Sequence, residues 1–430
     1  MTYQQTLDYI YAQLPMFSKI GAAAIKNGFD NILALCSSLG DPQKKTKFIH
    51  VAGTNGKGSV SHMLASALQT QGYKTGLYTS PHLLDFRERV KINGKMISEQ
   101  EVVEFIEKMR PEIERIRPSF FEITVALALE HFDRNTVDYA VLETGLGGRL
   151  DSTNIVHPVL SVITNIGFDH MQLLGNTLPR IAGEKAGIIK QGVPVVIGET
   201  HPETAPVFLE KAATVKAPIS FADKEFSAEE WHHEAGTLIV EVSKRDTVDH
   251  SVYRLDLPGI YQVRNLLTVL ESCRQLNHSG IVLDQAAIEK GVAHAKHISG
   301  LHGRWEILQK NPDIIMDVAH NEDGIRQLLN QLELTPYRKL HIVLGMVKDK
   351  DIAKVLSMLP LGALYYFTNA HIPRALNAKE LKEKAAGYQL TGADWPNVNA
   401  ALDAAKAIAH RDDLILICGS VFLIGEIDRS

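Results

Sequence analysis

The sequence contains few cysteines and no pattern that would bind zinc. Only three occur among 430 residues, Cys36, Cys273 and Cys418, and no two of them form a CxxC pair. An odd number of cysteines at such wide spacing argues against the disulfide framework of small secreted domains. We expect three reduced thiols in a cytoplasmic protein.

The sequence also lacks an excess of basic residues, a long apolar run and a leader-like N-terminus. Its formal net charge is −5, whereas nucleic-acid-binding domains usually present a basic surface. No run of eighteen or more apolar residues is present, which argues against a membrane-spanning helix. The first residues lack the basic and apolar regions of a signal peptide. We therefore expect no nucleic-acid partner and no membrane partner.

What the chain does contain is enough apolar sequence for more than one core. Hydrophobic residues make up 45% and charged residues 22% of the chain, which is ordinary for a globular protein. A chain of 430 residues is too long for a single core and suggests two domains, or three. We find no internal repeat and no low-complexity segment.

A glycine-rich stretch between a predicted strand and a predicted helix is the strongest local motif. Residues 48–52 are an apolar run of strand length, and apolar residues recur at helical spacing over 60–71. The turn between them, residues 53–59, can bind phosphate through its backbone N–H groups and the helix N-terminus. Lys57 can reach the terminal phosphates, and Ser59 can contact a phosphate or its magnesium ion. The spacing departs from that of the common P-loop, but the flanking strand and helix favour nucleotide binding.

Strands and helices alternate around this loop. We expect helices within 1–45 and at 99–110 and 122–132, and strands at 74–79, 137–142 and 159–164. Such alternation predicts parallel βαβ units, in which ligands bind at the carboxyl ends of the strands. A change of pattern between 192 and 260 predicts a small β-rich excursion, after which helices return at 261–276 and 284–294.

A second α/β set follows a candidate linker at 294–302, which holds two glycines and little apolar periodicity. We expect strands at 313–318, 340–346, 363–368 and 414–418, and helices at 323–333, 350–359, 378–387 and 399–410. This set is sufficient for a separate doubly wound, Rossmann-like domain. The predicted fold is α/β, with a P-loop ATPase-type parallel sheet in domain 1–296, a linker at 297–303 and the second domain at 304–430.

Several polar residues follow predicted strands, and each has a structural interpretation beside a functional one. Glu143 ends a buried-type strand near the phosphate loop, which suits a magnesium ligand, although a solvated strand end would have the same pattern. From spacing alone, His170 is more readily a structural histidine, and Lys185 and Lys190 are more readily a solvated helix end. Others indicate little by themselves: Asn265, Asp317, His320 and Asn321.

A set of motifs occurs in a characteristic order along the chain. They are HVAGTNGKGS (50–59), TSPHL (79–83), ETGLGGRLDSTN (143–154), DH (169–170), GEKAGIIK (183–190), GRWE (303–306) and DVAHN (317–321). Together they resemble the folylpolyglutamate synthase/dihydrofolate synthase family of Mur-type ATP-dependent amide ligases. The resemblance runs from about residue 5 to CGSVF at 418–422, and the additional glycine at position 58 is characteristic of this family.

The resemblance implies roles for residues throughout the chain. The ATP phosphates would be held by Gly53, Thr54, Asn55, Gly56, Lys57, Gly58 and Ser59, and the remainder of the nucleotide by Asn265, Arg304 and Asp317. Two Mg²⁺ ions would be bound with the ligands Ser80, Glu143 and His170, which reverses the structural interpretation of His170. The folate pocket would include Phe121, Glu122, Leu150, Asp151 and Ser152. Catalytic roles would fall on Lys57, on His320 and on Lys185 as a carbamylated lysine.

The implied chemistry passes through an acyl phosphate. A substrate carboxylate attacks the γ-phosphate of ATP, and the amino group of glutamate then displaces phosphate. Lys57 and magnesium would neutralise charge on the phosphoryl oxygens. Carbamylation of Lys185 requires a neutral amine, and a nearby cation lowers the pKa of a lysine from about 10.4. Because ligands come from both domains, we expect domain closure about the linker.

Two other interpretations fit less well. A peptidoglycan Mur ligase carries a substrate domain before the phosphate loop, and only 52 residues precede Gly53 here. A regulatory P-loop protein would leave Arg304, Asp317 and His320 without a role. The acceptor stays open between dihydropteroate and tetrahydrofolates, with the motif at 147–154 closer to bifunctional members. We expect a monomer that uses ATP, L-glutamate and a reduced folate or dihydropteroate.

Overall fold

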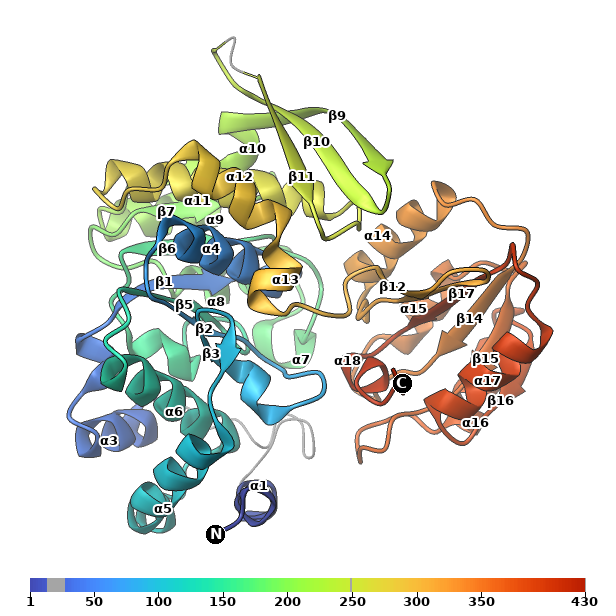
Figure 1. Cartoon of the computed structure of the whole chain (residues 1–430), viewed down its shortest axis with the longest axis horizontal. Coiled ribbons are helices and arrows are strands. Elements are labelled where there is room, and N and C mark those ends of the chain that lie inside the picture. The colour runs from blue at the N-terminus through green and yellow to red at the C-terminus, as the bar shows by residue number, and fades with distance from the viewer. Residues whose placement is uncertain (14–27, 248–249, 430) are drawn as a thin grey trace.

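The computed structural model describes residues 1–13, 28–247 and 250–429, which form two large sheets and one small sheet (Figure 1). The first sheet has the strand order β4-β3-β2-β5-β1-β6-β7-β8, and neighbouring strands from β2 to β8 run parallel. Its strands are β1 (Lys47–Ala52), β2 (Thr75–Tyr78), β3 (Val90–Ile92), β4 (Lys95–Met96), β5 (Tyr139–Glu143), β6 (Leu160–Ile163), β7 (Val195–Ile197) and β8 (Ile219–Phe221). Because β1 lies between β5 and β6, the loop after it opens at the centre of the carboxyl edge.

Helices cover both faces of this sheet, and the period-two pattern of β1 decides which residues meet them. Ile49 and Val51 point into one apolar core and Phe48 into the other. The first core is closed by α4 (Lys57–Gln71), α11 (Gln262–His278) and α12 (Gln285–Ala293). The second is closed by α1 (Tyr3–Gln13), α3 (Asp30–Ser38), α5 (Glu99–Ile116) and α6 (Phe120–Arg134). The remaining helices of this half are α7 (Met171–Leu174), α8 (Leu178–Ala186), α9 (Ala205–Thr214) and α10 (Ala222–Glu225).

The β-rich excursion is smaller than the sequence suggested. Only β9 (Phe226–Glu234), β10 (Thr237–Lys244) and β11 (His250–Leu255) form a separate antiparallel sheet. The preceding strands β7 and β8 extend the parallel sheet, with α9 between them. Each of those two strands has only three residues, too few for periodicity to assign. The excursion predicted for 192–260 was therefore wrong over its first thirty or so residues.

The predicted linker is partly helical. Ala295–Ser299 form α13, and the chain leaves this helix at Gly300, whose φ is +70°. The buried ammonium of Lys91 donates to the carbonyl oxygens of Ser299 (2.7 Å) and Gly300 (3.2 Å). Nδ1 of His62 lies 2.7 Å from Oγ of Ser299. These contacts hold α13 against β3 and α4, so the irregular part of the segment begins at Gly300.

The second large sheet has the order β12-β13-β17-β14-β15-β16, parallel except for the edge strand β12. Its strands are β12 (Glu306–Gln309), β13 (Asp313–Met316), β14 (Leu340–Leu344), β15 (Leu364–Phe367), β16 (Gly392–Asp394) and β17 (Leu414–Cys418). Its helices are α14 (Glu322–Glu333), α15 (Ile352–Met358), α16 (Ala378–Ala386), α17 (Val398–Ile408) and α18 (Val421–Ile424). The sequence predicted four of these strands but not the edge strands β12 and β16, and β16 is an exposed Gly-Ala-Asp segment without an apolar run.

Apolar side chains fill both faces of this second sheet. Figure 1 shows it beside the first sheet, reached through α13. Over the described ranges, no helix combines the length and apolar character needed to cross a bilayer.

Candidate active site

The phosphate loop connects β1 to α4 and depends on two glycines. Gly53 and Gly56 have φ values of +153° and +81°, which L side chains rarely adopt. A Cβ on Gly53 would lie 1.8 Å from Oγ1 of Thr164, and one on Gly56 would lie 2.3 Å from Oδ1 of Asn265. Both positions therefore need glycine for backbone conformation and for space.

The loop after β6 holds the phosphate loop in shape. The N–H of Thr54 donates to the carbonyl oxygen of Asn165 (3.0 Å), and the N–H of Asn55 donates to Oδ1 of the same residue (2.8 Å). Oγ1 of Thr164 donates to the carbonyl of Asn55 (2.6 Å), and the N–H of Gly167 donates to Oγ1 of Thr54 (3.0 Å). The conformation is thus set by hydrogen bonds before any ligand is present.

Two lysines meet at one carbonyl of this loop. Nζ of Lys57 donates to the carbonyl oxygens of Gly53 (3.1 Å) and Thr54 (3.2 Å), and Nζ of Lys185 donates to that of Gly53 (2.8 Å). Lys185 is 3% exposed, so the solvated helix end that spacing suggested is wrong for it. Burial and the charge of Lys57 lower the pKa of Lys185 to about 7. A substantial fraction of this amine is therefore neutral near pH 7.

Glu143 ends β5 beside β1 and is 4% exposed, so it is not a solvated strand end. Its Oε2 accepts a hydrogen bond from the N–H of Ser80 (3.3 Å). A Cβ on Gly58 would lie 3.8 Å from the same oxygen and 3.3 Å from Nη2 of Arg304. Burial raises the pKa of Glu143, and the charges of Lys57 and Arg304 oppose that shift. The buried carboxylate therefore lies close to the start of α4.

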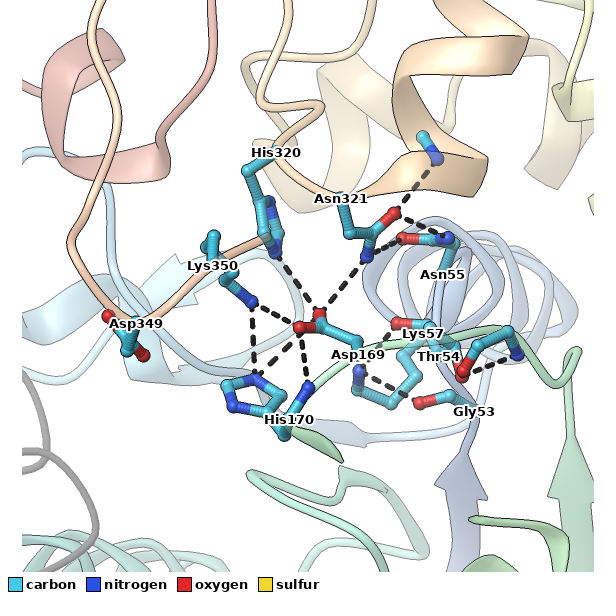
Figure 2. A network of polar contacts seen from close by, with 12 residues as sticks. Gly53, Thr54, Asn55, Lys57, Asp169, His170, His320, Asn321, Asp349 and Lys350 are labelled. Atoms are coloured by element: carbon cyan, nitrogen blue, oxygen red, sulfur yellow. Dashed lines mark hydrogen bonds and ion pairs between the residues drawn. The ribbon is translucent and has the colours of Figure 1, made fainter. Parts of the chain in front are cut away.

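Asp169 is the centre of a polar cluster that joins the two sheets (Figure 2). Nζ of Lys350 lies 2.5 Å from its Oδ1, Nδ2 of Asn321 donates to its Oδ2 (3.1 Å), and Nε2 of His320 lies 3.5 Å from Oδ2. Burial alone would raise the pKa of Asp169, but the hydrogen bond from His320 and the charge of Lys350 hold it well below its usual range. Asp169 is thus an anion held by three side chains from the second sheet.

His170 belongs to the same cluster. It has a left-handed backbone (φ +50°), and its Nε2 lies 3.5 Å from Nζ of Lys350. Burial and the charge of Lys350 lower the pKa of His170 to about 3. Its imidazole is therefore neutral at neutral pH, the form that can ligate a metal ion.

The phosphate loop also touches the second sheet's elements directly. Nδ2 of Asn55 donates to Oδ1 of Asn321 (3.2 Å), and Nδ2 of Asn321 donates to Oδ1 of Asn55 (3.1 Å). Oδ1 of Asn321 also caps α14 by accepting from the N–H of Gly324 (2.9 Å). One side chain therefore connects the loop, a helix terminus and the carboxylate of Asp169.

Asp317 connects the start of α11 with the segment that follows Arg304. The buried carboxylate accepts hydrogen bonds from the hydroxyl of Tyr261 (2.6 Å) and from the N–H groups of Trp305 (2.8 Å) and Ala319 (2.8 Å). Burial raises the pKa of Asp317, and these hydrogen bonds oppose the shift. With three partners, this side chain organises the linker end against α11.

A second chain of contacts joins α4 and α11. Nε2 of Gln262 donates to Oγ of the buried Ser59 (3.1 Å), and Nδ2 of Asn265 donates to Oε1 of Gln262 (2.8 Å). Asn265 therefore lies against Gly56 and is linked to Ser59 through one side chain.

Comparison with known proteins assigns this arrangement to a family. The description "Mur ligase middle domain" matches residues 51–273, and "Mur ligase, glutamate ligase domain" matches 303–421. The chain is 34% identical to the dihydrofolate synthase/folylpolyglutamate synthase of Bacillus subtilis over 99% of its own length and 98% of that protein's. The Escherichia coli protein of that name is 32% identical, over 98% and 96%. The chain belongs to the dihydrofolate synthase/folylpolyglutamate synthase family of Mur ligases.

Solved structures agree with this membership. Mycobacterium tuberculosis folylpolyglutamate synthase complexed with ADP matches with a TM-score of 0.87 at 30% identity, covering 98% of this chain and 96% of that one. E. coli FolC in complex with DHPP and ADP matches with a TM-score of 0.84 at 31% identity, covering 99% and 96%. The predicted α/β fold and the predicted family are both confirmed.

Eight of the residues predicted for this family's site line one cavity of about 780 Å³. It is lined by Ser80, Phe121, Glu122, Leu150, Asp151, Ser152, His170 and His320, among others. The carboxylates of Glu122 and Asp151 are already engaged. Oε2 of Glu122 accepts from the N–H of Ser119 (2.6 Å), and Oδ2 of Asp151 accepts from the N–H of Leu146 (2.8 Å). Both acids shape the cavity wall, and their contact with folate stays a prediction.

The residues predicted to bind magnesium suit that ion only in part. Mg²⁺ usually takes one or two protein carboxylates and completes its shell with phosphate oxygens and waters. The buried Glu143 next to Ser80 and Gly58 fits that donor set. Over the described ranges, no group of three or more His, Cys, Asp or Glu side chains could hold a metal ion by itself. His170 faces Lys350, so its metal role stays a prediction.

Sequence reasoning missed several residues that organise the site. Asn165 and Gln262 hold the phosphate loop and α4, and Lys350 balances Asp169. Asp169 itself precedes His170 in a motif, which was a usable signal. Lys350 lies in the polar segment after β14, and nothing in its local sequence separates it from a surface lysine.

Proposed function

We propose that this protein ligates L-glutamate to the carboxylate of a folate-type acceptor, with ATP as the phosphoryl donor. One observation carries the proposal: a single cavity adjoins the phosphate-loop side of the site through Ser80, the aromatic wall through Phe121, and the second sheet through His320. That arrangement suits a reaction that joins three small molecules. The named relatives and the ADP-bound neighbours support the same activity.

In the first step, an oxygen of the acceptor carboxylate forms a bond to the γ-phosphorus of ATP, and the bond to ADP breaks. In the second, the amino nitrogen of glutamate attacks the acyl carbon, inorganic phosphate leaves, and the nitrogen loses its proton. Lys57 would exchange its loop carbonyls for phosphoryl oxygens and neutralise the charge that develops there. His320 and Asn321 would orient groups on the glutamate side.

The remaining site assignments are part of the proposal. Glu143 and Ser80 would hold Mg²⁺, with His170 as ligand of a second ion, and magnesium would neutralise phosphoryl charge when bound. Arg304 would contact the nucleotide from beyond the linker, with Asn265 and Asp317 keeping the neighbouring segments in place. The phosphate loop 53–59 would bind the triphosphate.

Carbamylation of Lys185 is also proposed. The neutral amine would form a bond to the carbon of CO₂ and release a proton, which leaves an anionic carbamate. The supporting observations are the buried amine, its lowered pKa and its hydrogen bond to the carbonyl of Gly53. Over the described residues, no carboxylate lies within ion-pair distance of this ammonium to balance it.

We propose domain limits of 1–296 and 304–430; within the segment between them, residues 297–299 complete α13 and stay with the first domain, so that the pivot is the irregular part from Gly300 onward. The fixed position of α13 supports that pivot. A monomeric state and a cytoplasmic location stay predictions from the sequence.

The test is phosphate release with ATP and glutamate, run in parallel with dihydropteroate and with a tetrahydrofolate. We expect release that requires glutamate and at least one acceptor. Release without an acceptor would indicate an ATPase, and no release with either would contradict the proposal. The two arms also decide which acceptor the protein takes.

A further inference from the structure

One buried arginine in the cavity wall has no carboxylate partner among the described residues. Arg89 is 6% exposed, and its Nε donates to Nδ1 of His82 at 2.8 Å. Its guanidinium carbon lies 5.1 Å from the centroid of the Phe120 ring. His82 and Phe120 line the same cavity as Arg89. Over the described residues, no Asp or Glu oxygen lies within 4 Å of this guanidinium.

The other cationic side chains of the cavity wall differ in this respect. Each has a carboxylate partner: Lys350 with Asp169, Arg149 with Glu184, and Arg374 with Asp349. Within the described part of the chain, Arg89 is therefore the lining lysine or arginine whose charge no acid balances. Burial and Arg89 lower the pKa of His82 to about 3, so that partner is a neutral acceptor and leaves the positive charge in place.

Keeping an unbalanced guanidinium buried is costly unless a ligand supplies the missing anion. A guanidinium presents paired N–H donors that match the two oxygens of a carboxylate. Arg89 faces a cavity large enough for a small molecule, and its ring neighbour holds it in place. The missing anion is thus best supplied by a carboxylate of the substrate.

The position of Arg89 indicates which carboxylate of the substrate it binds. Its carbonyl oxygen accepts from the N–H of Thr79 (3.1 Å), so its backbone adjoins the segment that leads to Ser80, while its guanidinium lies over Phe120. The side chain therefore lies between the proposed phosphate end and the aromatic wall.

We propose that Arg89 binds the α-carboxylate of an acceptor that already carries glutamate. The inference rests on the proposed function and deepens it. A tetrahydrofolate presents an α-carboxylate beside its reacting γ-carboxylate, whereas dihydropteroate has one carboxylate and that one reacts. A paired guanidinium lowers the nucleophilicity of a carboxylate, which suits a group that must stay unreacted. Arg89 therefore determines specificity for glutamylated acceptors.

The experiment measures kcat and KM by phosphate release for Arg89→Gln and Arg89→Lys. The acceptors are a tetrahydrofolate, the same tetrahydrofolate with its α-carboxylate converted to a carboxamide, and dihydropteroate. The matched control is Arg110→Gln, because Arg110 lies outside the cavity, is paired with Glu114 and has a side chain that is 53% exposed.

We expect Arg89→Gln to raise KM for the tetrahydrofolate by about tenfold or more, the scale of one charge-assisted pair. The α-carboxamide should be poor for the parent protein and no poorer for Arg89→Gln. KM for glutamate should not change, and dihydropteroate, if it is a substrate, should be affected much less. Arg89→Lys should recover part of the loss, and Arg110→Gln should behave as the parent.

Each other outcome overturns the inference. If Arg89→Gln impairs the reaction of dihydropteroate as much as that of the tetrahydrofolate, Arg89 binds the reacting carboxylate. If the variant raises KM for glutamate, Arg89 binds the incoming amino acid. If Arg89→Gln still prefers the tetrahydrofolate over its α-carboxamide as strongly as the parent protein does, Arg89 does not contact the α-carboxylate. Loss of folding in both variants is recognised by circular dichroism, and the carboxamide comparison in the parent protein then decides: no preference for the acid contradicts the inference. If the parent protein releases no phosphate with any acceptor, the proposed function itself fails.

Discussion

The two large sheets contribute to the site in different ways. On the first sheet, Lys57 and Lys185 are held by carbonyls of the phosphate loop, and that loop is held by the segment after β6. On the second, His320 and Lys350 converge on a carboxylate of the first, Asp169. The hydrogen bonds that join the phosphate loop to these two lysines and to the segment after β6 therefore lie within one half of the molecule, whereas the charge of Asp169 is balanced by side chains of the other half.

This difference predicts that substitution of charged residues of the first half has large effects on activity. Lys57→Ala should lower kcat by at least about a hundredfold, because one preorganised electrostatic contact to the phosphoryl group is lost. The measurement is steady-state phosphate release, with the exposed Lys44→Ala as a control that should behave as the parent. A Lys57→Ala variant with most of its activity would mean that the loop is not the ATP cradle.

Lys185→Ala should be folded and lose activity by roughly a hundredfold, since a buried carbamate would supply charge that alanine cannot. Formate or acetate at high concentration should restore part of the rate. Carbon-13 NMR with labelled bicarbonate should show a carbamate in the parent protein and none in the variant. Full activity in Lys185→Ala would show that this lysine has a structural role and no catalytic one.

The same lysine predicts a pH dependence. The pKa of Lys185 in the folded protein is about 7, below its ordinary value, so the ammonium form increases as the pH falls through 7. Because CO₂ adds only to the neutral amine, the carbamate signal should weaken below about pH 7 and be strong above it. A signal that does not change between pH 6 and 8 would contradict the predicted titration.

Glu143→Gln should have a smaller effect that magnesium partly reverses. The substitution keeps the shape of the side chain and removes the anionic oxygen that Mg²⁺ prefers. We expect activity to fall by about tenfold at low magnesium and to recover as magnesium rises, by mass action. Magnesium titrations of the parent and the variant that superimpose would exclude Glu143 as a ligand.

The smallest expected effect tests the contact between the halves. Asn55→Ala and Asn321→Ala remove opposite sides of one amide pair, so their effects on the free energy of unfolding should not add. We expect a coupling of about 1 kcal/mol in a double-mutant cycle by chemical denaturation. Asn397→Ala is the matched control, because Asn397 caps α17 as Asn321 caps α14 but has no partner role in this pair. Additive effects would show that the two halves do not support each other here.

The same contrast explains what the sequence could predict. The phosphate loop is a local strand–turn–helix signal, and β1 and α4 lie within a few residues of their predicted positions. The pairing of Lys350 with Asp169 joins positions far apart in the chain, and no local pattern encodes such a contact. The short strands β7 and β8 were not predicted for a related reason. Each has only three residues, and its pairing with neighbouring strands of the sheet defines it more than its own sequence does.

The anchoring of α13 limits how the two halves can move. Since Lys91 and His62 fix Ser299, that helix moves with the first sheet, and any rotation must be taken up by backbone torsions from Gly300 to the start of β12. Gly300 and Gly303 both have positive φ values, so two of these few joints are residues with wide torsional freedom. If the two halves rotate relative to each other, the displacement of His320 and Lys350 would therefore be set by the few backbone torsion angles between Gly300 and β12.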